Sequence, residues 1–337
     1  MINGHGDDLY KYNDIRTNFS SNVYSHVDHS GLYSHLAQAM ENIVSYPEPQ
    51  PYSLEKSIAG EYGIDKDMVC ATNGATEAIY LLAQAYRESN SAVLVPTFSE
   101  YADACILNSH RLYKFYTLET IPDEATMVWI CNPNNPTGEA YDRERIEMLA
   151  ERYPGRLFII DQSYEAFTTK ELFNPSDSLK YNNIVILHSL TKHFAVPGLR
   201  IGYITAHPEI IKRIRAFVKP WSVNSLAISA GIYLIEHKSD YELNLNSLLE
   251  ERKRVSAELE KLGVLEPWTS DTHYMLVHMR FGNAKALKDY LACNHGILIR
   301  DASNFDGLDN SYFRIAIQTP DENNRLINAI KEWIYSL

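Results

Sequence analysis

The chain has 337 residues and a formal net charge of −12 at pH 7; 45% of its residues are hydrophobic and 22% are charged. This is the composition of an ordinary soluble globular protein, and the length suits two domains. The acidic balance argues against a large basic surface, so we expect no nucleic-acid partner and no binding to an anionic membrane.

The cysteines and the N-terminus favour a cytoplasmic protein. The N-terminal residues have no apolar signal region, and no stretch approaches the roughly 20 apolar residues of a membrane span. No C-x-x-C pair occurs, so buried reduced cysteines are favoured over disulfides or zinc, and we expect no metal site. The cysteines are Cys70, Cys105, Cys131 and Cys293.

In chain order, residues 1–45 read as an irregular arm with a helix near 31–40. An arm of this kind usually lies across another part of the protein or a partner subunit. A proline-punctuated loop at 46–51 follows. Residues 52–62 are predicted to form a helix, because apolar residues recur four apart on one face. These residues are Leu54, Ile58 and Tyr62.

A short strand at 68–71 leads through a glycine turn into an apolar helix at 78–86. The turn contains Gly74, Ala75 and Thr76. Free backbone N–H groups at such a helix start point outward along the helix dipole, which favours an anion. Many such turns bind nothing, so this signal is weak when it stands alone.

Short apolar runs then alternate with helical segments. This alternation favours a mostly parallel sheet with helices on both faces, and ligands of such sheets bind at the carboxyl ends of the strands. The expected strands are 92–95, 112–116, 127–131, 157–160, 184–187 and 201–205, and the expected helices are 98–108, 143–153 and 208–218.

The last third reads as a smaller α+β unit. A helical stretch at 226–262 is predicted, with a break near 238–240. Strands are expected at 274–279, 297–299 and 312–317, and helices at 284–294 and 322–335. We therefore predict an N-terminal arm (1–45), a large domain (46–225), and interdomain helices with a small C-terminal domain (226–337).

The most informative stretch is 188–203, which reads H-S-L-T-K-H-F-A-V-P-G-L-R-I-G-Y. Lys192 follows Ser189 and Thr191 closely and precedes Arg200. A lysine amine can form an imine with an aldehyde while hydroxyls and a guanidinium hold a phosphate. A lone lysine in a loop is usually a surface residue, so the interpretation depends on the other motifs.

This stretch resembles the Schiff-base lysine segment of the fold-type I enzymes that use pyridoxal phosphate, the aspartate aminotransferase superfamily. The resemblance implies an α/β fold, with a three-layer large domain that binds the cofactor. Lys192 would be the catalytic lysine. Ser189, Thr191 and Arg200 would hold the cofactor phosphate together with the turn of Gly74, Ala75 and Thr76.

Other motifs carry further roles under the same resemblance. Asn135, in the run N-P-N-N-P-T-G, would contact the ring oxygen of the cofactor, and so would Tyr164. Asp161 would pair with the pyridine nitrogen, which keeps the ring an electron sink. The structural alternative for the N-P-N-N-P-T-G run is a turn rich in Asn and Pro. The structural alternative for Asp161 is a helix cap or a turn residue.

Two aromatic residues complete the expected cofactor site. Tyr101, in the run P-T-F-S-E-Y, would stack on the cofactor ring, with Phe98 as the competing choice. Tyr46 would reach the cofactor phosphate of a neighbouring subunit. The resemblance therefore implies a homodimer whose site lies at the subunit interface.

Two arginines in apolar strands of the small domain point to the substrate. Arg300 and Arg314 each offer a planar guanidinium that suits a carboxylate or a phosphate, and a structural salt bridge is the alternative. Two such cations suggest a substrate with two anionic groups, such as an amino acid that carries a phosphate.

The runs G-I-L-I-R-D-A-S-N-F-D-G-L-D and Y-F-R-I-A-I resemble the threonine-phosphate decarboxylases of the cobalamin pathway. The histidinol-phosphate aminotransferases are close relatives. The resemblance implies decarboxylation of L-threonine O-3-phosphate to aminopropanol phosphate and CO2. An aminotransferase is the alternative, and a non-catalytic binding protein is a third. Substrate contacts would come from His5, Asn22, Asn135, Arg300 and Arg314.

The sequence departs from these relatives at two places. Gln162 and Ser163 replace the expected Glu-Ala after Asp161, and Tyr164 looks more like the aminotransferases. His273 stands where Asn is expected before Tyr274. These departures bear on the choice of reaction more than on the cofactor.

Overall fold

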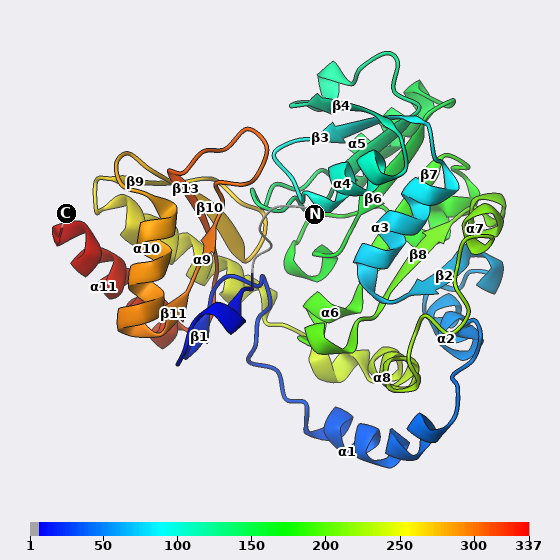
Figure 1. Cartoon of the computed structure of the whole chain (residues 1–337), viewed down its shortest axis with the longest axis horizontal. Coiled ribbons are helices and arrows are strands. Elements are labelled where there is room, and N and C mark those ends of the chain that lie inside the picture. Colours follow the sequence, from blue (N-terminus) through cyan, green and yellow to red (C-terminus); the bar gives the residue numbers. More distant parts are fainter. Residues whose placement is uncertain (1–6, 337) are drawn as a thin grey trace.

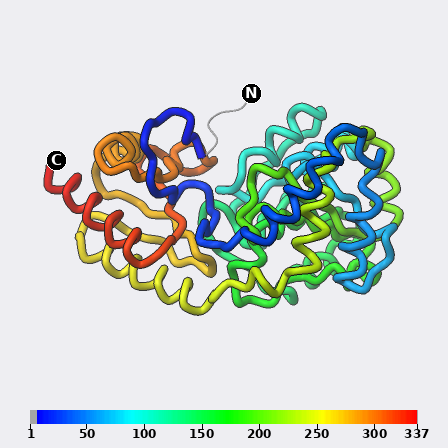
Figure 2. Tube along the Cα trace, turned by 90° about the horizontal axis from the view of Figure 1, so that it is seen from below, coloured from blue at the N-terminus to red at the C-terminus, as the bar shows by residue number. Residues whose placement is uncertain are grey.

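The structure is a computed structural model of the chain, and it describes residues 7–336. Two parts lie side by side, each built on its own sheet (Figure 1). The N-terminal segment runs beside the smaller part and then crosses to the larger one, as the blue trace in Figure 2 shows. No helix among residues 7–336 combines the length and the apolar character needed to cross a membrane.

The larger part contains a seven-stranded sheet. Its strands are β2 (Val69–Thr72), β3 (Asn90–Leu94), β4 (Arg111–Phe115), β5 (Met127–Cys131), β6 (Leu157–Asp161), β7 (Ile184–Ser189) and β8 (Gly202–Ala206). They lie in the order β2-β8-β7-β6-β5-β3-β4. β8 runs antiparallel to both neighbours, whereas the other pairings are parallel. The predicted mostly parallel sheet is thus confirmed.

Helices cover both faces of this sheet, which gives three layers. The period-two alternation of strand side chains explains why. In β5, Trp129 faces one apolar cluster, whereas Val128 and Ile130 face another. The first cluster includes residues of α3 (Gly74–Ala85), α4 (Glu100–Leu107) and α7 (Pro208–Arg215), and the second includes α5 (Arg143–Arg152).

A third cluster holds the helices at the β2 edge. Leu54 and Ile58 are fully buried there, as the spacing of apolar residues in 52–62 predicted. Gly231 faces Leu54 so closely that a Cβ at position 231 would lie 2.7 Å from the leucine side chain. The helices involved are α1 (Ser30–Ala39), α2 (Tyr52–Tyr62) and α8 (Ser225–Glu236).

The smaller part is an antiparallel sheet backed by helices. The strands are β9 (Leu265–Pro267), β10 (Tyr274–Met279), β12 (Arg300–Asp301) and β13 (Tyr312–Ala316), in the order β12-β13-β10-β9. The helices are α9 (Leu245–Glu260), α10 (Ala284–Tyr290) and α11 (Pro320–Tyr335). The break predicted near 238–240 is present, because α8 ends at Glu236 and α9 begins at Leu245.

The arm joins the smaller part through backbone pairing. β1 (Thr17–Asn18) pairs in parallel with β11 (Ile297–Leu298). The strand predicted at 297–299 is found at 297–298, where it pairs with the arm, and a separate strand that begins at Arg300 pairs with β13. A buried ion pair of 2.7 Å between Lys288 and Asp8 also fixes the arm. The predicted domain boundaries stay a prediction.

Candidate active site

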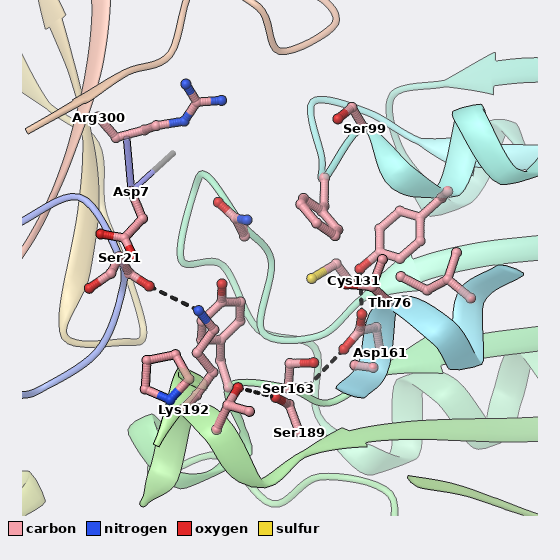
Figure 3. A pocket seen from close by; sticks show the side chains of 18 of the residues that line it. Asp7, Ser21, Thr76, Ser99, Cys131, Asp161, Ser163, Ser189, Lys192 and Arg300 are labelled. Atoms are coloured by element: carbon pink, nitrogen blue, oxygen red, sulfur yellow. Dashed lines mark hydrogen bonds between the residues drawn. The ribbon is translucent and has the colours of Figure 1, made fainter. Parts of the chain in front are cut away.

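A cavity of about 240 Å³ lies where β5, β6 and β7 end, and the arm and the smaller part close its other side (Figure 3). Parallel strands end at one edge of a sheet, so residues far apart in sequence meet there. Most of the predicted site residues line this cavity: Ala75, Thr76, Tyr101, Asn135, Asp161, Tyr164, Ser189, Thr191, Lys192, Arg200, Arg300 and Arg314.

Polar donors gather at one end of the cavity, beside the start of α3. The hydroxyls of Ser189 and Thr191 lie 2.7 Å apart, and Arg200 adopts a left-handed backbone conformation with φ of 58°. Gly74 has φ of 82°, and a Cβ there would lie 2.6 Å from the Arg200 guanidinium. Glycine at position 74 therefore leaves room for a guanidinium at the helix N-terminus, where an anion is favoured.

Asp161 ends β6 and is nearly fully buried, with an exposed fraction of 4%. The Tyr101 hydroxyl donates to Oδ2 at 2.7 Å, and the Ser163 backbone N–H donates to Oδ1 at 2.9 Å. Burial, together with the Asp161 charge, holds the pKa of Tyr101 well above its usual range, so this hydroxyl remains a donor. The carboxylate is thus held in one orientation at the cavity wall.

Lys192 lies opposite, and its Nζ donates to the backbone carbonyl of Ser21 at 3.0 Å (Figure 3). Burial, together with the charges of Arg314 and, less strongly, of Arg200, lowers the pKa of Lys192 to about 8. The charges of Asp7 and Asp161 act in the opposite direction. An amine with this pKa is partly neutral near pH 7, which is what a nucleophilic or proton-transferring lysine needs.

The two predicted arginines lie opposite each other on β12 and β13. Arg314 is buried and donates to Asn135 Oδ1 and to the Ser20 carbonyl, both neutral acceptors. Arg300 donates to Asn304 Oδ1 at 2.7 Å. Burial, together with the neighbouring Arg314 charge, lowers the pKa of Arg300 to about 10. The two cations thus create a strongly electropositive cavity wall.

These groups fit pyridoxal phosphate, which carries an aldehyde, a phosphate and a pyridine nitrogen. The space that Gly74 leaves for Arg200 would form part of a phosphate cradle. Lys192 would supply the amine, and the Asp161 carboxylate would suit a protonated nitrogen. Because Asn135 accepts from Arg314 with its oxygen, its amide nitrogen is the group that would reach the ring oxygen.

Among the described residues, Gly74, Asn22 and Tyr46 were predicted for the site but do not line the cavity. Asn22 is fully buried, and neither polar atom of its side chain has a hydrogen-bond partner among the described residues. Tyr46 is 84% exposed, and its ring lies 5.2 Å from that of Trp221. His5 lies outside the described residues. Their roles stay predictions.

The predicted ring stack also stays a prediction. Tyr101 lines the cavity, but its ring packs against Trp129 with centroids 5.8 Å apart, and its hydroxyl is committed to Asp161. Phe98, the competing choice, lines the same cavity and is less buried. Both aromatic residues therefore stay candidates for the stack.

His273, one of the departures noted in the sequence, is fully buried and stacks on Phe167 with ring centroids 3.8 Å apart. Neither ring nitrogen has a hydrogen-bond partner among residues 7–336. Burial lowers the pKa of His273 to about 3, and the charges of Arg314 and Lys192 act in the same direction. The imidazole is therefore neutral and does not provide a further cation.

Several lining residues were not predicted. The arm contributes Asp7, Ser20 and Ser21, and no local sequence signal marks them because they reach the cavity from the far end of the chain. Ser163 could have been found, since it follows a strand-end carboxylate by two residues. Asn304 and Phe305 also line the cavity, and their only signal was the closeness of Arg300 in sequence.

The sequence matches the family described as aminotransferase class I and II over residues 14–330. The chain belongs to this family. Among solved family structures, L-threonine-O-3-phosphate decarboxylase from Porphyromonas gingivalis is 36% identical, with a TM-score of 0.93. The similarity covers 95% of this chain and 99% of that one.

Two further proteins that are similar to this chain are an aminotransferase and a protein of adenosylcobalamin biosynthesis. Histidinol-phosphate aminotransferase from Clostridium acetobutylicum is 28% identical, with a TM-score of 0.85, over 95% of this chain and 100% of that one. The adenosylcobalamin biosynthesis bifunctional protein CobDQ of Leptospira interrogans is 29% identical over 94% of this chain. The chain spans 38% of the length of that bifunctional relative.

Proposed function

We propose that the chain is a pyridoxal-phosphate-dependent decarboxylase of L-threonine O-3-phosphate that forms aminopropanol phosphate and CO2. The observation that carries this proposal is the pair of arginines opposite each other on β12 and β13, both lining the cavity. Two neighbouring cations match a substrate with a carboxylate and a phosphate. The likeness to the Porphyromonas gingivalis decarboxylase supports the same substrate.

Pyridoxal phosphate, when bound, supplies an aldehyde that captures the substrate amine and a ring that withdraws electrons from the α-carbon. In our proposal Ser189, Thr191 and Arg200 hold its phosphate. Asp161 pairs with its pyridine nitrogen, in an orientation already fixed by the hydrogen bond from Tyr101 at 2.7 Å.

The substrate side is assigned from the contacts of Lys192. Arg314 donates to the Ser20 carbonyl and Lys192 Nζ donates to the adjacent Ser21 carbonyl, so we take Arg314 to be the arginine closer to the reacting carbon. We assign it the substrate carboxylate, one bond from the α-carbon. Arg300, which lies opposite Arg314, takes the phosphate, which is further along the substrate.

Lys192 is the residue that moves protons. A lysine whose pKa is about 8 can release and accept a proton near neutral pH. After loss of CO2 we expect Lys192 to deliver a proton to the α-carbon. The side chains that exclude water here include the aromatic ring of Tyr164, whose centroid lies 5.9 Å from Nζ.

The test is a decarboxylation assay on the holoenzyme with L-threonine O-3-phosphate and no keto acid. We expect equimolar CO2 and aminopropanol phosphate over many turnovers. If turnover requires 2-oxoglutarate and yields glutamate, the chain is an aminotransferase. The likeness to the Clostridium acetobutylicum histidinol-phosphate aminotransferase, at 28% identity, makes that enzyme class the second candidate.

We also propose a homodimer. A set of large apolar side chains is exposed around the start of the larger part, which is typical of a protein interface. The Trp221 backbone N–H donates to the Pro49 carbonyl at 3.0 Å, which joins the two ends of this surface. The exposed residues are Ile43, Val44, Tyr46, Tyr52 and Trp221.

Dimerisation through this surface would account for a Tyr46 that is exposed and distant from its own cavity. Sedimentation should show a dimer for the native chain and a monomer for Val44→Glu, with weaker cofactor retention in the monomer. A native chain that sediments as a monomer would contradict the dimer. The cytoplasmic location stays a prediction, and the name of the Leptospira interrogans relative supports a place in cobalamin biosynthesis.

A further inference from the structure

Asp7 is an acidic residue of the arm that lines the active-site cavity. It lies beside Ser21 on the arm side of Lys192, whereas Asp161 lies on the opposite side (Figure 3). Asp161 is buried at the end of β6, but Asp7 is exposed. The cavity therefore has one carboxylate deep on the cofactor side and a second one near solvent, and the proposed reaction assigns no role to the second.

The Asp7 carboxylate is held by the arm itself. Asn18 Nδ2 donates to Asp7 Oδ1, and the Asp7 N–H donates to Ser20 Oγ at 3.2 Å. The Asn18 amide is oriented in turn, because its oxygen accepts from the Ser20 N–H at 2.8 Å. Asn18 also pairs with Leu298 in β11. Asp7 is thus attached to a segment of the arm that is packed on the smaller part.

The hydrogen bonds of Asp7 leave its charge in place. Asn18 and Ser20 are both neutral, so they orient the carboxylate without cancelling its charge. Burial and the charge of Arg314 lower the pKa of Lys192, and the Asp7 charge opposes them more strongly than the Asp161 charge does. A negative charge in this position stabilises a cation that occupies the place of the Lys192 amine.

An amino acid substrate brings such a cation. The arginines that line the cavity attract any small molecule that carries a carboxylate and a phosphate. The substrate also carries an ammonium group, which must approach Lys192 because both amines combine with the same aldehyde carbon. The arginines disfavour that ammonium, whereas Asp7 favours it. Asp7 therefore has opposite effects on ligands with an amine and on anions without one.

We propose that Asp7 is a specificity-determining residue, which attracts the ammonium group of an amino acid substrate toward Lys192 and disfavours anions that carry a carboxylate and a phosphate but no amine. This inference rests on the proposed function, and it names a third substrate group that the same site recognises. Asp7 takes no part in bond breaking, so the chemistry at the α-carbon does not depend on it.

The test replaces Asp7 with asparagine, which keeps an acceptor oxygen for Asn18 and removes only the charge. Asparagine also tolerates the left-handed backbone of Asp7, where φ is 62°. Asp14→Asn is the matched control, because Asp14 is another exposed aspartate of the arm, has φ of 60° and does not line the cavity. Cofactor absorbance checks that each variant is folded and loaded.

Two ligands are compared on each holoenzyme. Calorimetry measures binding of 3-phosphoglycerate, which has a phosphate and a carboxylate but no amine, and Asp7→Asn should bind it about fivefold more tightly because a repulsive charge is removed. KM for L-threonine O-3-phosphate should instead rise about fivefold, with kcat within about twofold, since binding but not chemistry is affected. Both shifts should shrink as salt is added, because Asp7 is exposed. Asp14→Asn should match the native chain in both measurements.

Opposite shifts for the two ligands would support the role of Asp7. A shift of both in the same direction would overturn it, since a general structural role affects the two ligands alike, and so would no shift of either. Asp7→Glu keeps the charge and should keep the native preference. If Asp7→Asn does not retain cofactor, the neutral variant Asp7→Ser gives the same decision by the same two measurements.

The proposed function and the role of Asp7 fail separately. If the native chain does not decarboxylate L-threonine O-3-phosphate, the function is wrong, and titration of the cofactor absorbance with this compound replaces KM. Opposite shifts of its affinity and that of 3-phosphoglycerate would then still support the role of Asp7. If the native chain decarboxylates it and the two shifts are not opposite, the function stands and the role of Asp7 is wrong.

Discussion

The two sides of the cavity are built differently. On the cofactor side, hydrogen bonds join residues of the larger part to one another, as between Tyr101 and Asp161 or Ser189 and Thr191. On the substrate side, they join distant segments. Arg314 donates to Asn135 and to Ser20, so the smaller part, the larger part and the arm all meet at one guanidinium.

This difference separates cofactor binding from substrate recognition. The cofactor side is shaped mainly by one sheet edge, and its one hydrogen bond to the arm described above is that of Lys192 to the Ser21 carbonyl. The substrate side exists only when three segments are packed together. A change in the smaller part can therefore alter the substrate without altering the cofactor, as expected in a family that includes both decarboxylases and aminotransferases.

The largest effect should come from Lys192, which faces both sides. Lys192→Ala should lower kcat by about 10⁴-fold or more, because the group that transfers protons is lost. Borohydride reduction should attach the cofactor covalently to Lys192 in the native chain and to no lysine in the variant. Peptide mass mapping would locate the attached cofactor. Lys212→Ala, a change at an exposed lysine, is the control and should behave as the native chain does. Labelling of Lys192→Ala at another lysine would refute the assignment.

Asp161→Asn tests the cofactor side alone. We expect kcat to fall by about 10²–10³-fold, because a fixed charge at the ring nitrogen is replaced by a neutral amide. KM for the substrate should change little, since the substrate contacts lie on the opposite wall. Steady-state kinetics at saturating cofactor would check this. A rise in KM without loss of kcat would place Asp161 on the substrate side instead.

Arg314 and Arg200 give the sharpest contrast between the two sides. Arg314→Lys should raise KM for the substrate about a hundredfold and leave cofactor affinity within about twofold, because a point charge cannot replace a two-pronged guanidinium. Arg200→Lys should instead weaken cofactor affinity and leave KM for the substrate nearly unchanged. Equilibrium dialysis of the cofactor and steady-state kinetics on the same preparations decide the matter. If either variant lost cofactor affinity and substrate affinity to the same extent, the two sides of the cavity would not be functionally distinct.

The pH dependence of cofactor uptake tests the environment of Lys192. Capture of the aldehyde needs the neutral amine, and the pKa of Lys192 is about 8. The uptake rate of the apoenzyme should therefore rise about tenfold per pH unit below that value and level off above it. Arg314→Met removes a positive charge that lowers this pKa, so its curve should move to higher pH. A midpoint near that of an ordinary lysine in the native chain would contradict the lowered pKa.

The smallest expected effect is that of Tyr101→Phe. It removes one hydrogen bond to Asp161 and keeps the ring packed against Trp129, so we expect kcat to fall by about fivefold. A drop as large as that of Asp161→Asn would mean that Tyr101 touches the reacting atoms. Parallel kinetic measurements on the two variants would show which description holds.

The cofactor side could be predicted from sequence because its signals are local. Asp161 and Ser189 each lie at the end of an apolar strand, and Gly74 is the first residue of α3. Neighbouring parallel strands bring such positions together, so placing them on strands was enough to place them in one site. Arg300 and Arg314 were also found this way, because charged residues are rare in apolar strands.

The rest of the site could not be predicted, because it depends on long-range packing. Ser20 and Ser21 reach the cavity only because the arm pairs with β11, and a polar turn-rich segment gives no indication of its partner. The sequence around Tyr101 does not show that its hydroxyl donates to Asp161. Asn304 looked like an ordinary turn residue until its bond to Arg300 was seen.

The most direct test of the account is the specificity constant, kcat/KM, for CO2 release from L-threonine O-3-phosphate and from L-threonine. Two cations lining one cavity predict a preference of about 10³-fold or more for the phosphorylated substrate, because an unphosphorylated one cannot form the charged hydrogen bonds that a phosphate would make there. Histidinol phosphate, which has no carboxylate, should release no CO2. Equal constants for the two threonine substrates, or faster turnover of histidinol phosphate with a keto acid, would contradict the account.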